Sequence, residues 1–147
     1  MNRPLLEVKN LTVQFRLRLG ILTAVNDVSF TIQEKETLGI VGETGCGKSA
    51  TGLSILRLIS SPPGTIPGGE ILFEGDDLLK KSEREMEKIR GNKISMIFQE
   101  PMTSFNPSFT IGEQIAESYR IHRRHSRKLA LVSAEHIPGA VWVPSPG

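Results

Sequence analysis

The chain has 147 residues, of which 38% are hydrophobic and 23% charged, and its formal net charge is +2. These values are typical of a globular protein with one sizeable core, and they exclude a fibrous or wholly disordered chain. The charge is too small to imply a nucleic-acid partner. No apolar stretch approaches the roughly 18 residues of a spanning helix, and the single cysteine, Cys46, cannot form an internal disulfide, so we expect a cytoplasmic protein.

The first third of the chain has the patterns of three strands. Apolar and polar residues alternate in residues 5–15 and again in residues 28–32, as in half-buried strands, with a loop around Gly20 between them. Residues 37–41 form a short apolar run, which is typical of a strand covered on both faces.

Helical and strand patterns alternate after Ser49. Apolar residues recur at helical spacing from Leu53 until the Pro and Gly residues of 60–64, and residues 70–74 predict another strand. A surface helix is expected over residues 82–90, with Ser82 as its N-cap.

The rest of the chain predicts one more strand and one more helix. The strand is expected at residues 93–98, and a capping box at Thr110 and Glu113 predicts a helix from Ile111 to about Ile121. Beyond residue 131 the pattern degrades and prolines and glycines accumulate, so we expect a poorly ordered tail at 131–147.

One loop carries the strongest chemical signal, because it matches the phosphate-binding pattern G-x-x-x-x-G-K-[ST]. It consists of Gly42, Glu43, Thr44, Gly45, Cys46, Gly47, Lys48 and Ser49. Glycines let backbone N–H groups turn toward phosphate oxygens, and the lysine reaches the β- and γ-phosphates. The Ser49 hydroxyl can ligate magnesium, and the predicted helix after the loop points its positive end at the same anion.

A cluster of basic residues near the end of the chain has two interpretations. It contains Arg120, His122, Arg123, Arg124, His125, Arg127 and Lys128. On a helix such a run favours a solvated face over a phosphate-binding patch.

Three segments around this loop resemble the ATP-binding subunits of bacterial dipeptide and oligopeptide ABC importers. They are residues 24–30, residues 36–42 and residues 94–107, of which the last, ISMIFQEPMTSFNP, is the most specific. The resemblance covers about residues 5–128. It implies an α/β fold, the N-terminal part of a P-loop NTPase core of ABC type, with a mixed sheet and an antiparallel β subdomain.

The resemblance also implies roles for single residues. Gln99 matches the Q-loop glutamine, which contacts magnesium and the attacking water; a turn residue at a strand end is the alternative. Phe15 matches the aromatic that stacks on adenine, and a core aromatic is the alternative. Lys35 stands where relatives usually carry glycine, so we expect a turn that needs positive φ to be either strained or differently shaped there.

The implied organisation is an ATPase part at 1–110, the start of a helical subdomain at 111–130 and the tail. The implied ligands are ATP and Mg²⁺, and the implied partners are permease subunits and a second ATPase subunit at the cytoplasmic face of the inner membrane. The signature loop, Walker B strand, catalytic glutamate and switch histidine have no counterpart here. We therefore expect no useful ATP turnover by the chain alone, and uncovered apolar strand edges.

Three other functions compete with that of a peptide importer. An ABC-type ATPase acting on nucleic acid would use the basic cluster, and a non-catalytic nucleotide-binding module would need only the loop. A small-metabolite kinase would leave the segment around Gln99 without an explanation.

Overall fold

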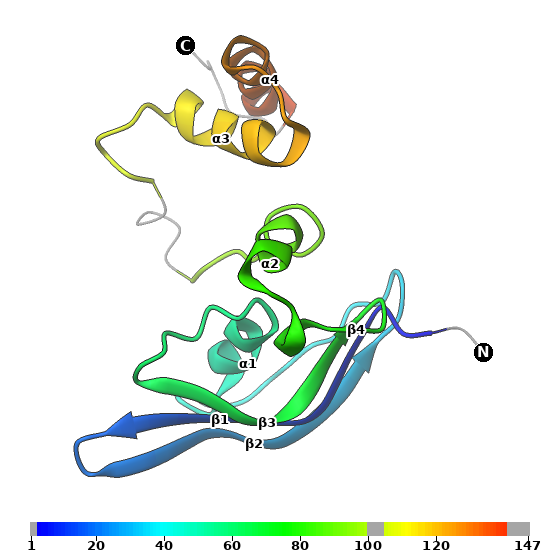
Figure 1. Cartoon of the computed structure of the whole chain (residues 1–147), viewed down its shortest axis with the longest axis vertical. Helices are drawn as coiled ribbons and strands as arrows, with labels where there is room; N and C mark the ends of the chain where they lie inside the picture. Colours follow the sequence, from blue (N-terminus) through cyan, green and yellow to red (C-terminus); the bar gives the residue numbers. More distant parts are fainter. Residues whose placement is uncertain (1–2, 100–104, 141–147) are drawn as a thin grey trace. The chain divides into compact units, whose positions relative to one another are not determined.

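The computed structural model describes residues 3–99 and 105–140, with side chains described to residue 137. The chain divides into two compact units, residues 1–86 and residues 87–147. The boundary at residue 110 between the ATPase part and a helical subdomain, expected from the sequence, stays a prediction. Each unit is described by itself below (Figure 1).

The first unit is built on a four-stranded antiparallel sheet with the order β2-β1-β3-β4. Its strands are β1 (Leu6–Leu17), β2 (Gly20–Ile32), β3 (Gly64–Phe73) and β4 (Asp76–Asp77). The predicted alternation places the inward residues of β1 in the core, and Leu11 and Val13 are completely buried. Figure 1 shows β1 lying between its two long neighbours.

A polar contact fixes an irregularity in the long hairpin. Asn10 in β1 and Asp27 in β2 both have left-handed backbones, with φ of 48° and 54°. The Asn10 amide Nδ2 donates to Asp27 Oδ1 at 2.7 Å, beside a register shift between Val8 and Leu11. Asparagine and aspartate tolerate this backbone better than other non-glycine residues, which explains their presence here.

Helix α1 (Lys48–Ile55) follows the glycine loop as predicted, although it ends sooner than the apolar spacing suggested. Arg57 stops it with a left-handed backbone, φ 51°. The Arg57 guanidinium group donates to the carbonyl oxygens of Leu78 and Lys81, and it lies 3.9 Å from the Glu83 carboxylate. The end of α1 is thereby tied to the segment that follows β4.

Two predicted strands do not form. Residues 37–41 run without sheet pairing, and residues 93–98 contribute only one isolated bridge, from Ile94 to Arg90. Within the described part of the chain no strand lies alongside either segment, and a strand needs a hydrogen-bonded neighbour as well as apolar residues. Val41 and Ile97 are each 92% exposed as a result.

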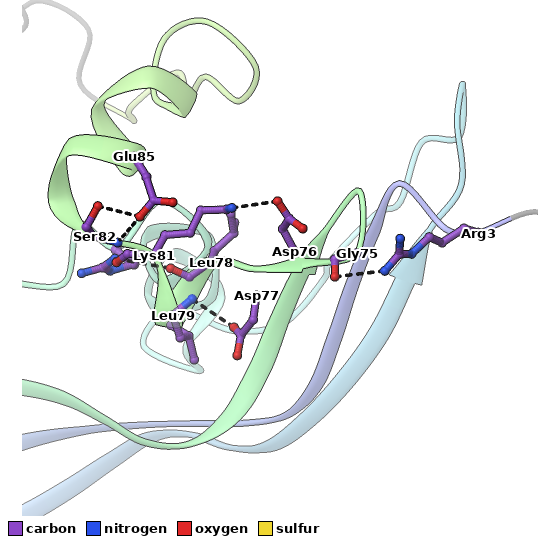
Figure 2. A network of polar contacts seen from close by, with 10 residues as sticks. Arg3, Gly75, Asp76, Asp77, Leu78, Leu79, Lys81, Ser82 and Glu85 are labelled. Carbon is purple, nitrogen blue, oxygen red and sulfur yellow. Dashed lines mark hydrogen bonds and ion pairs between the residues drawn. The ribbon is translucent and has the colours of Figure 1, made fainter.

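A chain of polar contacts connects β4 to η1 (Leu78–Lys80) and α2 (Glu83–Ile89) (Figure 2). Asp77 caps η1 by accepting from the Leu79 amide at 3.0 Å and pairs with Lys80, also at 3.0 Å. Burial raises the pKa of the Asp77 carboxyl, but the hydrogen bonds from Lys80 and the backbone outweigh it, so the pKa lies below its usual value. Glu85 accepts from the Ser82 amide and hydroxyl at 2.8 and 2.6 Å, which confirms Ser82 as the start of this helix.

The second unit contains α3 (Ile111–Arg123) and α4 (Arg127–Ala140). The Thr110 hydroxyl accepts from the Glu113 amide at 3.3 Å, which confirms the predicted cap of α3. Helix α4 occupies much of the expected disordered tail. Ala116, Ala130 and Ala134 form a small buried cluster between the two helices.

None of the helices in the described ranges is both long and apolar enough to cross a membrane. Residues 100–104 and 141–147 lie outside those ranges, and so therefore does part of the segment that follows Gln99.

Candidate phosphate-binding site

The glycine loop lies between the unpaired segment 37–41 and the first turn of α1. Gly45 and Gly47 both take left-handed backbones, with φ of 86° and 94°. A β-carbon on Gly47 would lie 2.2 Å from the Ala24 carbonyl oxygen of β2. Only glycine fits this position, because its neighbour is backbone that cannot move aside. The loop therefore rests directly on the hairpin.

The Lys48 side chain folds back over the loop. Its Nζ donates to the carbonyl oxygens of Gly42 at 2.7 Å and Glu43 at 2.6 Å, and it lies 3.6 Å from Cys46 Sγ. A positive charge is thus held at the mouth of the loop by neutral oxygens. An anion can attract it, since no carboxylate competes for it among these contacts.

The N-terminus of α1 has free donor capacity. Gly47 is the N-cap, and no side chain caps the first turn. Helices leave their first N–H groups without intrahelical partners, and these groups favour an anion together with the helix dipole. Thr51 closes the turn from the other side, since its hydroxyl donates to the Gly47 carbonyl at 3.0 Å. Thr51 lies outside the phosphate-loop pattern, so it was not predicted from the sequence.

A cavity of about 660 Å³ borders the loop. Its walls come from the loop and α1 (Cys46–Lys48 and Thr51), from β2 (Thr23–Asn26 and Val28–Phe30) and from Leu38–Val41. Except for Thr23, these β2 residues belong to the segment 24–30 of the family resemblance, but none of them was predicted as a site residue. Their position next to the loop follows from the Gly47 contact.

The predicted residues outside the loop have different environments. Phe15 is half-buried in β1, paired with Leu22 and Gly64, and it is not among the residues that line this cavity. Gln99 is exposed and belongs to the second unit. Their roles toward adenine and magnesium stay predictions.

The donor set suits a magnesium ion held mainly by phosphate. The described residues contain no group of three or more His, Cys, Asp or Glu side chains that could hold a metal. Magnesium bound with a nucleotide takes one or two protein ligands, the phosphates and water, and the exposed Ser49 hydroxyl is of a type that can serve as one of these ligands.

The basic cluster of the second unit is partly neutralised. Arg127 donates to Glu113 Oε1 through Nε at 3.0 Å, and Arg120 lies 4.0 Å from the same carboxylate group. These pairs support the solvated-face interpretation over a phosphate-binding patch.

The family model described as ABC transporter matches residues 25–141. The chain belongs to the ABC transporter family. The predicted α/β class of ABC type is thereby confirmed, and the sheet described here is its antiparallel part.

Similar sequences and structures are ATP-binding proteins of this family. The chain is 47% identical over 142 residues to the "probable peptide ABC transporter ATP-binding protein y4tR" of Sinorhizobium fredii, covering 97% of this chain and 42% of that one. It is 46% identical to the oligopeptide transport ATP-binding protein OppD of Bacillus subtilis, covering 97% and 40%. The chain thus spans about two fifths of the length of these curated relatives.

Among solved structures, a dimeric bacterial ABC transporter cassette, MJ0796, superposes with a TM-score of 0.73 at 25% identity. The match covers 86% of this chain and 53% of that chain. A post-hydrolysis state of the same cassette, bound to ADP and phosphate, gives a TM-score of 0.68 at 24% identity, covering 86% and 54%.

Proposed function

We propose that this chain is the nucleotide-binding part of an ATP-binding subunit of a peptide importer. In this proposal Gly42–Ser49 binds the phosphates of Mg-ATP, and binding energises transport through membrane-spanning permease subunits and a second ATPase subunit. The names of the similar proteins from Sinorhizobium fredii and Bacillus subtilis support the solute class. The location would be the cytoplasmic face of the plasma membrane.

The observation that carries the proposal is the combination of Lys48 and the uncapped helix. One ammonium and the free N–H groups of the first turn of α1 converge on the same loop. Neither group has a carboxylate partner in the contacts of the loop, so a phosphate meets both a full charge and oriented dipoles. Ser49 would supply the magnesium ligand next to them, and Gln99 would reach the metal and the attacking water.

Turnover is proposed to need more than this loop. A general base accelerates a reaction by about 10²–10⁴-fold. Groups that stabilise the charge on the γ-phosphate in the transition state add to this acceleration. The loop supplies neither a general base nor a second set of such groups. We therefore expect nucleotide binding by the chain without phosphate release near the ~1–10³ s⁻¹ of typical enzymes.

Isothermal titration with Mg-ATP tests the proposal. Lys48→Ala should weaken binding about 10- to 150-fold, because a charge-assisted contact worth roughly 1.5–3 kcal/mol is lost while the loop donors remain. Lys88→Ala, at an exposed position on α2, is the matched control and should leave affinity unchanged. Equal affinity for wild type and Lys48→Ala would refute the site.

A further inference from the structure

The far end of the β1–β2 hairpin extends beyond the rest of the sheet. The last pair between β1 and β3 is Phe15 with Gly64, whereas β1 and β2 continue to pair as far as Leu17 with Gly20. A backbone bond from the Arg16 amide to the Pro63 carbonyl, at 2.9 Å, lies just beyond that last pair. Residues 16–22, here called the hairpin tip, thus include a two-stranded extension.

The hairpin tip exposes large aliphatic side chains. Leu17 and Leu22 are each 52% exposed, Ile21 is 64% exposed and Leu19 is fully exposed. The apolar residues of β1 nearer its start, such as Leu11 and Val13, are completely buried. Four exposed aliphatic residues within six positions form a patch of the kind that marks an interaction site.

The charge of the hairpin tip is wholly positive. Arg16 and Arg18 are both exposed, and neither forms an ion pair within the part of the chain that the structure describes. The sequence has no carboxylate from residue 8 to residue 26. A partner for this surface must therefore offer negatively charged groups for the arginines and an apolar region that can bury the aliphatic side chains.

We propose that the hairpin tip is a contact site for the surface of an anionic phospholipid bilayer. The aliphatic side chains would enter the boundary between head groups and acyl chains, and the two guanidinium groups would bind lipid phosphates. A single-stranded nucleic acid fits less well, because proteins bind its bases with stacking aromatic side chains and the hairpin tip has none.

Vesicle co-sedimentation of the whole chain tests this proposal. We expect binding to vesicles of phosphatidylcholine and phosphatidylglycerol at 3:1 and no binding to pure phosphatidylcholine. Arg16→Gln with Arg18→Gln should weaken binding about 30-fold, since each arginine near an anionic surface contributes roughly fivefold. Leu19→Asn with Ile21→Asn should weaken it about tenfold by removing apolar area.

The matched control is Arg123→Gln with Arg124→Gln, which removes the same charge from exposed positions in the second unit. It should leave vesicle binding within about twofold of wild type. An equal loss with this control, or equal binding to neutral vesicles, would overturn the assignment to the hairpin tip. Lys48→Ala should leave vesicle binding unchanged, so failure of this proposal and failure of the nucleotide site can be told apart.

A second measurement does not depend on loss of binding. Leu19→Trp in a Trp142→Phe background places the only tryptophan at the hairpin tip. Its emission should shift to shorter wavelength when phosphatidylglycerol-containing vesicles are added, because the indole leaves water. Unshifted emission with vesicles that do bind the protein would show that another surface makes the contact.

Discussion

Two apolar stretches of the first unit have similar compositions and opposite environments. Ile71 of β3 is completely buried, because β3 pairs with β1 and β4 along the sheet. Val41, in the segment that leads into the glycine loop, is 92% exposed. Strand propensity is the same kind of signal in both, so the difference lies in whether a partner strand is present among the described residues.

The first prediction measures this difference directly. Ile71→Ala should lower the free energy of unfolding by about 2–5 kcal/mol, because it removes buried methyl groups and leaves a cavity. Val41→Ala should change it by no more than about 0.5 kcal/mol, as at other exposed sites. Urea unfolding followed by circular dichroism measures both. A large loss from Val41→Ala would mean that this segment is covered in solution.

The second prediction concerns the close approach of the glycine loop to strand β2, between Gly47 and Ala24. Gly47→Ala should destabilise the unit by about 2–4 kcal/mol and abolish nucleotide binding, since its β-carbon would collide with the Ala24 carbonyl. Gly45→Ala is the control, because it has a similar backbone but nothing within 4 Å of an added β-carbon. It should cost only the left-handed strain of about 1–2 kcal/mol. Similar losses for the two variants would contradict the contact.

The third prediction concerns the polar network around Asp77, which follows the C-terminal end of β3. Asp77→Ala should cost about 0.5–2 kcal/mol through loss of the cap on η1. Because the pKa of Asp77 is lowered in the folded state, its ionisation stabilises the fold above the ordinary pKa, near 3.8. That contribution is lost as the pH falls through the lowered folded value. In Asp77→Asn the free energy of unfolding should therefore depend less on pH below about 4 than in wild type. The same pH dependence in both proteins would count against this network.

The fourth prediction has the smallest effect and lies where β2 leads toward the exposed segment. Lys35 has a φ of 62°, which confirms the positive φ expected where relatives carry glycine. Lys35→Gly should stabilise the unit by about 0.5–1 kcal/mol. This is the strain energy of a left-handed non-glycine residue that is relieved, minus the larger conformational entropy that glycine loses on folding. Lys35→Ala keeps the strain and should be neutral. Thermal melts of the two variants would separate these effects.

Local signals in the sequence predicted local structure well. The alternation around Leu11 and Val13 predicted β1, the caps at Ser82 and Thr110 predicted two helix starts, and the phosphate-loop pattern predicted a glycine loop directly before a helix. Each of these depends on residues only a few positions apart.

The features that the sequence did not reveal depend on distant partners. Alternation cannot show whether residues 37–41 have a neighbouring strand, and small residues such as Ala130 and Ala134 give little apolar signal although they pack α4 against α3. The cavity wall from β2 could be found only after the close approach of Gly47 to Ala24 was known. Long-range packing is the missing information in every case.

The contact between Gly47 and Ala24 also sets which positions are free to vary. The loop touches β2 there through the carbonyl of Ala24, which every amino acid possesses, and Ala24 itself is only half-buried. Position 24 should therefore accept many side chains, whereas position 47 accepts glycine alone. In a library randomised at both positions and selected for nucleotide binding, diversity should survive at 24 and vanish at 47.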